Sequence, residues 1–302
     1  MQTTNTPATK QLLQVHRTDS AHWVGDGFPV RSIFDYENLG REALSPFLLM
    51  DYAGPAQFAP VAEPRGVGEH PHRGLETVTL AYQGEVEHRD SNGGGGRIGP
   101  GDVQWMTAAS GVMHEEKHSR AFTERGGIFE MIQLWVNLPA KDKMSAPGYQ
   151  TLPASRIPAV KLPDQAGEVR VVAGEFQGAR GPAHTFTPIN LWEISLRAGA
   201  KATFDLPEGH TAAFFVRRGR VEVPGSRETA GEAALALFSR EGRRVTLAAR
   251  EDTALLFLGG EPIAEPVVGQ GPFVMNTAGE IRQAIADVRA GRFGRLEPAA
   301  LS

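Results

Sequence analysis

The chain has 302 residues, which suggests about two domains of roughly 150 residues each. Its net charge of −4 argues against direct contact with nucleic acid or with an anionic membrane surface. The absence of cysteine excludes disulfides, zinc–thiolate sites, iron–sulfur clusters and thiol nucleophiles, so a bound metal would need imidazole, carboxylate or water as ligands.

The first half of the chain alternates short apolar segments with turn residues. The dipeptides Gln83-Gly84 and Asn92-Gly93 favour turns, because glycine and asparagine tolerate positive φ. The glycine run 93–96 could instead form a phosphate cradle, but no GK[ST] sequence or βαβ unit follows, so a turn is favoured. We expect strands at residues 12–17, 29–34, 46–53, 75–82, 84–91, 102–108, 111–119 and 129–138.

The second half repeats this pattern. A stretch rich in proline and lysine, residues 138–158, is interpreted as a boundary between domains. Beyond it, extended segments recur about every 10–15 residues, which indicates an all-β barrel or sandwich. YQGEVE at 82–87 and RRGRVEV at 217–223 indicate a weak internal duplication.

One helix is predicted near the C-terminal end. Thr277 as N-cap and Glu280 at the third helical position form a capping box, and Gly291 is placed just past the end. The apolar stripe that would pack on a barrel comprises Ile281, Ala284, Ile285 and Val288.

No apolar run approaches the ~20 residues that span a bilayer. The first residues, MQTTNTPATKQLLQ, also lack the apolar segment of a signal peptide. We therefore expect a cytoplasmic protein without membrane contact.

Two residue pairs predict a metal site. His70 and His72 are two residues apart, as are His114 and Glu116, and residues at this spacing on a strand leave the same face. Two strands could thus bring three imidazoles and one carboxylate to one point. Such ligands suit Fe, Mn, Ni, Cu or Zn.

The sequence around both pairs resembles the cupin superfamily. HPHRGLETVTLAYQG has the H-x-H-x3-E-x7-G arrangement of the first cupin motif, and PGDVQWMTAASGVMH ends in A-x-G-x-x-H, as the second does. The longer stretches GEVEHRDSNGGGGRIGPGDVQWMTAASGVMHEE and GEPIAEPVVGQGPFVMNTAGEIRQAIADVRAGRFG resemble the pirin family, and the resemblance covers most of the chain.

This resemblance implies the fold and the domains. Pirins are bicupins, so two cupin barrels (double-stranded β-helix or jelly-roll) packed together are expected, with a short C-terminal helix. The expected domains are a metal-binding N-terminal cupin at 13–139 and a C-terminal cupin-like domain without a metal site at 140–291, which includes the helix at 278–290. Residues 150–270 contain only His184 and His210, without paired spacing. A monomer is expected.

The general cupin motif and the pirin pattern differ over the carboxylate ligand. The first would use Glu76, whereas the pirin pattern uses Glu116, two residues after the third histidine. Strand parity also favours Glu116, since Gly74 makes a bulge between His72 and Glu76 plausible. The predicted ligands are therefore His70, His72, His114 and Glu116. Glu76 is expected to orient a ligand imidazole, and Glu115 to point away.

Other residues near the motifs receive plainer interpretations. His88 and His118 are expected to be structural, because neither has a paired partner. Trp105 and Met106 are interpreted as core residues, with substrate lining as the alternative. Arg73 is either an exposed strand residue or a charge at the cavity mouth.

The resemblance extends to bacterial pirin-like quercetin 2,3-dioxygenases, which implies an enzyme that opens a flavonol ring with O₂. One divalent ion, Fe(II) above the other metals, would bind the flavonol, and Glu116 would act as general base. Met106, Trp105 and Met113 would line an apolar substrate cavity. The alternative is an iron-dependent, redox-sensing binding partner of a transcription factor or metabolic enzyme.

Overall fold

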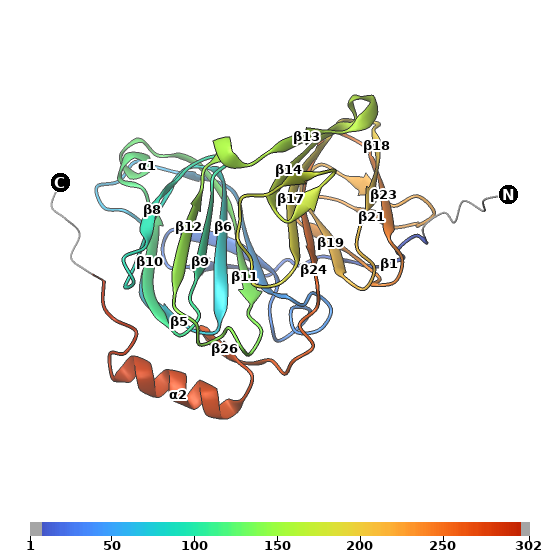
Figure 1. Ribbon diagram of the computed structural model, residues 1–302. Coiled ribbons are helices and arrows are strands. Elements are labelled where there is room, and N and C mark those ends of the chain that lie inside the picture. Colours follow the sequence, from blue (N-terminus) through green and yellow to red (C-terminus); the bar gives the residue numbers. More distant parts are fainter. Residues whose placement is uncertain (1–7, 297–302) are drawn as a thin grey trace. The chain divides into compact units, whose positions relative to one another are not determined.

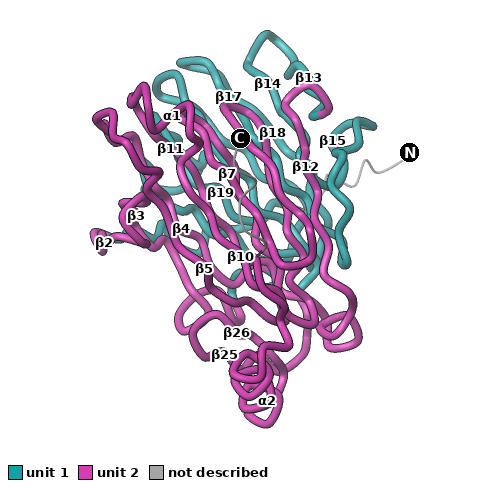
Figure 2. Tube along the Cα trace, turned by 90° about the vertical axis from the view of Figure 1, so that its left-hand side faces the viewer, with its two compact units in different colours: residues 1–18, 43–46, 157–262 teal, residues 19–42, 47–156, 263–302 magenta. Residues whose placement is uncertain are grey.

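A computed structural model of the chain describes residues 8–296. Strands dominate it (Figure 1), as the sequence predicts. Two compact units form, each from more than one stretch of chain (Figure 2). Within the described residues, unit 1 comprises 8–18, 43–46 and 157–262, and unit 2 comprises 19–42, 47–156 and 263–296. No described helix is long and apolar enough to cross a membrane.

Unit 2 contains two antiparallel sheets and a two-stranded ribbon. The larger sheet, in the order β12-β9-β6-β11-β4-β3-β2, consists of β2 (Ala21–Val24), β3 (Phe28–Phe34), β4 (Phe47–Phe58), β6 (Leu75–Gln83), β9 (Val103–Thr107), β11 (Gly127–Asn137) and β12 (Gly148–Leu152). The smaller sheet, in the order β5-β10-β7-β8, consists of β5 (Gly66–His72), β7 (Val86–Asp90), β8 (Gly95–Ile98) and β10 (Val112–His118). The ribbon pairs β25 (Val268–Gln270) with β26 (Phe273–Met275).

Apolar side chains from both sheets of unit 2 meet in one core. Val86 and Ile98 of the smaller sheet pack in a cluster with Phe58, Ala81 and Phe129 of the larger one. Strand β10 alternates buried and half-buried residues along its whole length. This alternation is typical of a strand with one face toward a core, and it turns every second residue of β10 inward.

Unit 1 has the same all-β character. Its larger sheet, in the order β1-β22-β19-β24-β17-β14-β13, consists of β1 (Leu12–His16), β13 (Ala159–Lys161), β14 (Gly167–Ala173), β17 (Ile189–Leu196), β19 (Thr211–Arg218), β22 (Ala234–Phe238) and β24 (Thr253–Gly260). Its other strands are β15 (Glu175–Phe176), β16 (Ala179–Arg180), β18 (Lys201–Asp205), β20 (Val221–Glu222), β21 (Thr229–Ala230) and β23 (Arg244–Ala249).

Aromatic rings fill the interior of unit 1. Trp192 lies 4.6 Å from Phe257, and Phe214 lies 4.7 Å from Phe257, between ring centroids. Phe176 and Phe204 extend the same cluster. These tilted rings occupy the space in which a cupin barrel could otherwise hold polar ligands.

The helices are short. The predicted capping box is confirmed in α2 (Ala278–Arg289), where Thr277 and Glu280 bond reciprocally. Its buried residues, among them Ile281 and Ala284, pack with Phe273 and Phe293 in unit 2. The remaining helical segments are α1 (Arg120–Arg125) and the 3₁₀ turns η1 (Ala154–Arg156) and η2 (Pro163–Gln165).

The two units differ from the expected domains at several places, among them residues 43–46, which belong to unit 1. Strand β1 pairs with β22 in unit 1, although residues 13–139 were expected to form the N-terminal domain. The stretch 138–158 contains β12, which pairs with β9 in unit 2. Helix α2 belongs to unit 2 rather than to the domain at 140–291, because its apolar stripe is buried there.

Candidate metal centre

The three predicted histidine ligands lie on two neighbouring strands of unit 2. Strand β5 carries His70 and His72, and β10 carries His114. The two strands are antiparallel, with His114 opposite His70 and Val112 opposite His72. Each pair of rings is close, with centroids 5.0 Å apart for His70 and His72, 4.2 Å for His70 and His114, and 4.8 Å for His72 and His114.

One ring nitrogen from each of the three histidines lies within 4.8 Å of the other two. His70 Nδ1 faces the carbonyl oxygen of Gly68 at 2.8 Å, and His72 Nδ1 faces that of Pro272 at 3.3 Å. A carbonyl can only accept, so both Nδ1 atoms donate, which leaves Nε2 with its lone pair free for an ion.

The environment of His114 also fits a metal. Its ring is fully buried, and its Nε2 has no hydrogen-bond partner among the described residues. Burial, reinforced by the neighbouring His72, holds the pKa of His114 well below its ordinary value. Burial likewise lowers the pKa of His72 to about 3. Both rings are therefore neutral, which is the form that binds a metal, and a divalent ion would satisfy the orphaned nitrogen.

Glu116 lies beside this triad. It is buried on the same face of β10 as His114, and its Oε1 accepts hydrogen bonds from Thr79 Oγ1 and Gln104 Nε2, both at 3.1 Å. The structure groups Glu116 with His88 and His114 within 4.8 Å, rather than with all three predicted histidines. Its neighbour Glu115 points to the other face, toward Arg89 at 2.5 Å and Lys117 at 3.1 Å, as strand parity predicts.

The expected role of Glu76 is wrong. Its carboxylate accepts a hydrogen bond from Thr107 Oγ1 at 2.7 Å. Glu76 and Thr79 are three residues apart on β6, so their side chains leave opposite faces of the sheet. The hydroxyl of Thr79 reaches Glu116, so Glu76 lies on the face away from the metal centre. Burial raises the pKa of Glu76 to about 7.

The three residues expected to line a substrate cavity do not lie together. Trp105 and Met106 are adjacent on β9, so their side chains leave opposite faces. Met106 packs with Val112 and Tyr149 on the face of β9 that also presents Gln104, whereas Met113 packs with Phe273, Met275 and α2. Trp105 is a core residue, and Met113 is half-buried against the cluster around α2.

Sequence reasoning missed the residues behind His114. His88 is fully buried within β7, and its Nδ1 lies 3.3 Å from His114 Nδ1 and 4.0 Å from Glu116 Oε1. Its Nε2 lies 3.4 Å from Asp90 Oδ2. His88 and Asp90 have the two-residue spacing that identified the other pairs, and this signal could have found them. His118 is structural as expected, bonded to Gly27 and packed among phenylalanines.

The C-terminal segment reaches the metal centre from about 200 residues away. Besides the contact between Pro272 and His72, Arg73 donates to Asp287 of α2 at 2.8 Å and to the carbonyl of Ser110 at 2.7 Å. Arg73 is therefore a buried residue whose guanidinium is hydrogen-bonded, and it is not the exposed strand residue that was one of the two expectations. Lys143, also buried, donates to the carbonyls of Gly74 and Val274 at 2.6 and 2.9 Å.

Comparison with known proteins identifies the family. A family model described as Pirin matches residues 27–136, and one described as Pirin C-terminal cupin domain matches residues 191–294. The chain belongs to the pirin family. It is 57% identical over 286 residues to a protein of Pseudomonas aeruginosa named "Putative quercetin 2,3-dioxygenase", covering 95% of this chain and 99% of that protein. A "Pirin-like protein" of Solanum lycopersicum is 38% identical over 275 residues, covering 89% of this chain and 88% of that protein.

A solved structure shows the same fold. The crystal structure of a quercetin 2,3-dioxygenase from Acinetobacter baumannii superposes with a TM-score of 0.93 at 52% sequence identity, covering 96% of this chain and all of that chain. The predicted all-β fold with two cupin domains is thus confirmed.

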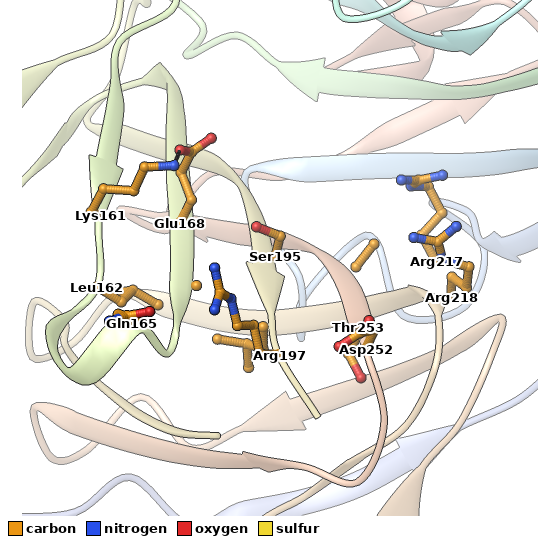
Figure 3. Close-up of a pocket in the computed structure, with 13 residues that line it drawn as sticks. Lys161, Leu162, Gln165, Glu168, Ser195, Arg197, Arg217, Arg218, Asp252 and Thr253 are labelled. Carbon is orange, nitrogen blue, oxygen red and sulfur yellow. Dashed lines mark hydrogen bonds and ion pairs between the residues drawn. The ribbon is translucent and has the colours of Figure 1, made fainter. Parts of the chain in front are cut away.

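Unit 1 of this pirin has a cavity of a different kind. It measures about 630 Å³ and its lining contains no histidine. Figure 3 shows Lys161 and Glu168 paired on one side, Arg217 and Arg218 on the other, and Arg197 between them. No group of metal-ligating residues is found among the described residues of unit 1, and the expectation that its barrel lacks a metal stays a prediction.

Proposed function

We propose that the chain is a metal-dependent dioxygenase of the quercetinase type, which opens a flavonol ring with O₂. The observation that carries the proposal is the convergence of His70, His72 and His114, with the buried Nε2 of His114 left without a partner. The names of the Pseudomonas and Acinetobacter relatives support the choice of a flavonol as substrate.

The proposed ligands are His70, His72 and His114, each through Nε2, together with Glu116. Three neutral imidazoles and one carboxylate would hold one divalent ion and leave positions for water or substrate. Fe(II) is the proposed ion, and Mn, Ni, Cu and Zn are the alternatives that this donor set also accepts. A bound ion of this kind would supply Lewis acidity, which makes a flavonol hydroxyl more acidic and aligns it with O₂.

Glu116 is proposed to accept the proton of that hydroxyl. Thr79 and Gln104 both donate to its Oε1, so this oxygen is fixed in place. Its Oε2 has no hydrogen bond among the described residues, so this oxygen would face the ion and would take up the proton when it loosens from the ion. Thr79 has one hydroxyl proton, so if it donates to Glu116, Gln133 must turn its amide NH₂ group toward Thr79 Oγ1 at 2.7 Å.

Aromatic residues beside the centre support a planar substrate. The ring of Trp135 lies 5.1 Å from that of His72, and Tyr36 stacks on Trp135 with an interplanar angle of 18°. Met106, two strands along the same row of the larger sheet, and Val112 of β10 are buried and apolar. These side chains would exclude water from the reacting atoms and pack against flavonol rings.

The test is turnover of quercetin by protein loaded separately with each candidate metal. Oxygen uptake and loss of the flavonol absorption should occur together and in equal amounts. If no metal supports turnover although the protein binds the ion, the proposal fails. The iron-dependent, redox-sensing binding partner would then be the better hypothesis, to be examined by pull-down with iron-loaded protein.

A further inference from the structure

We infer that His88, backed by Asp90, is a positioning residue that holds the ring of His114 with its Nε2 directed at the proposed ion. The inference rests on the metal centre proposed above, and His88 and Asp90 are not among its four proposed ligands. It is carried by side-chain contacts between the paired strands β10 and β7. In this pairing His114 lies opposite Asp90, and Glu116 lies opposite His88.

Each ring nitrogen of His114 and His88 has one consistent role as donor, acceptor or metal ligand. If His114 binds an ion through Nε2, the proton of its neutral ring is on Nδ1. That N–H faces His88 Nδ1 at 3.3 Å, so His88 accepts there and carries its own proton on Nε2. His88 Nε2 then donates to Asp90 Oδ2 at 3.4 Å. The tautomer of His114 is thus set by the residues behind it.

Asp90 is itself held in place by backbone donors. Its Oδ1 accepts hydrogen bonds from the N–H groups of Asn92 at 2.8 Å and Gly94 at 2.9 Å, which leaves Oδ2 for His88. A side chain at position 94 would collide with the Asp90 carboxylate and with Tyr149. The glycine-rich turn therefore serves the metal centre by fixing the carboxylate at the end of the chain of contacts.

The ring of His88 is also fixed from the side. Tyr149 stacks on it, with centroids 5.0 Å apart and an interplanar angle of 17°. The Tyr149 hydroxyl donates to Gln104 Oε1 at 3.1 Å, and Gln104 Nε2 donates to Glu116 Oε1. The same buried group of side chains thus supports both proposed ligands of β10.

The test measures Co(II) affinity by competition with a chelator and records the visible Co(II) spectrum. His88→Phe keeps a ring against Tyr149 but removes both nitrogens, and His88→Gln restores one acceptor and one donor. His118→Phe is the matched control, because it removes another inward imidazole of unit 2 that lies among phenylalanines. His118 pairs with Val86, at the opposite end of β7 from Asp90.

His88→Phe should bind Co(II) about 10–100-fold more weakly, with an altered spectrum, because the ring of His114 can rotate. His88→Gln should recover to within about threefold of the wild type, and His118→Phe should match the wild type. Thermal unfolding without metal shows whether His88→Phe folds. If it does not fold, Asp90→Asn is tested in its place. A Co(II) affinity reduced by about threefold to tenfold in Asp90→Asn supports the inference, and an unchanged affinity overturns it.

The outcomes separate this inference from the metal centre itself. Wild-type protein that binds no Co(II) would overturn both. Wild-type binding with an unchanged affinity and spectrum in His88→Phe would overturn only the positioning role. A second Co(II) per chain that is lost in His88→Phe would show that His88 is a ligand with Glu116, and would also overturn the positioning role.

Discussion

Arg73 and Asp287 form a buried ion pair, with Nη1 and Oδ2 2.8 Å apart and the two residues only 4% and 7% exposed. Arg73 directly follows His72, and Asp287 lies on the inner side of α2. The guanidinium of Arg73 also lies 4.5 Å from the ring centroid of Phe293. The pair therefore fastens the C-terminal segment to the strand end that carries a proposed ligand.

Removing one partner of this pair should be costly. Asp287→Ala leaves the Arg73 charge buried without a counter-ion, so the free energy of unfolding should fall by about 3 kcal/mol. Asp287→Asn keeps a hydrogen-bond acceptor and should cost less. Urea denaturation of both variants measures the difference. A loss below about 0.5 kcal/mol in Asp287→Ala would mean that the pair contributes nothing beyond a surface contact.

Glu116 and Glu115 offer a matched pair for the proposed general base. Glu116→Gln should lower the rate of quercetin turnover by at least about 100-fold in metal-replete protein, because an amide cannot accept the substrate proton. Glu115→Gln should stay within about twofold, since Glu115 faces Arg89 and Lys117 on the other side of β10. Metal content must be measured in each sample. Undiminished turnover by metal-loaded Glu116→Gln would rule out the base.

Glu76 should make stability depend on pH. Its pKa is about 7 in the folded chain against an ordinary value of 4.5, raised mainly by burial. The folded state thus holds this proton more tightly, so stability is full below about pH 4.5 and falls as pH rises through about 7. The loss is on the order of 3 kcal/mol above that range.

Glu76→Gln should remove that loss, because the neutral amide can still accept from Thr107. Urea denaturation should find the variant more stable than the wild type near about pH 8.5, with the difference shrinking toward about pH 5. An equal difference at both values would show that Glu76 does not titrate in this range.

Strand alternation made much of the site predictable. It depends only on local backbone geometry. The two-residue spacing therefore put His70 and His72 on one face of β5, and His114 and Glu116 on one face of β10. Glu115, between them, faces away from the metal centre. The same rule places His88 and Asp90 on one face of β7, and it turns the adjacent residues Trp105 and Met106 to opposite faces of β9. Trp105 therefore cannot line a cavity together with Met106.

Contacts between distant segments could not be derived in this way. His72 meets Pro272 and Arg73 meets Asp287 across about 200 residues, and no local pattern gives the register of such contacts. The capping box predicted the start of α2 and Gly291 its end to within one residue, but neither predicted the unit on which the apolar stripe packs. The pairing of β1 with β22 in unit 1 is likewise set by packing between segments far apart in the sequence.

Metal stoichiometry tests the convergence of the three histidines most directly. Protein purified without added metal is titrated with Fe(II) under anaerobic conditions, beside His72→Ala and His114→Ala. The wild type should bind one ion per chain and unfold at a higher temperature when loaded, since binding to the folded state alone stabilises it by about 2.7 kcal/mol at a hundredfold excess over Kd. Both variants should lose binding and the rise in unfolding temperature. A wild type that binds no ion, or variants that bind it equally well, would contradict a metal centre at these residues.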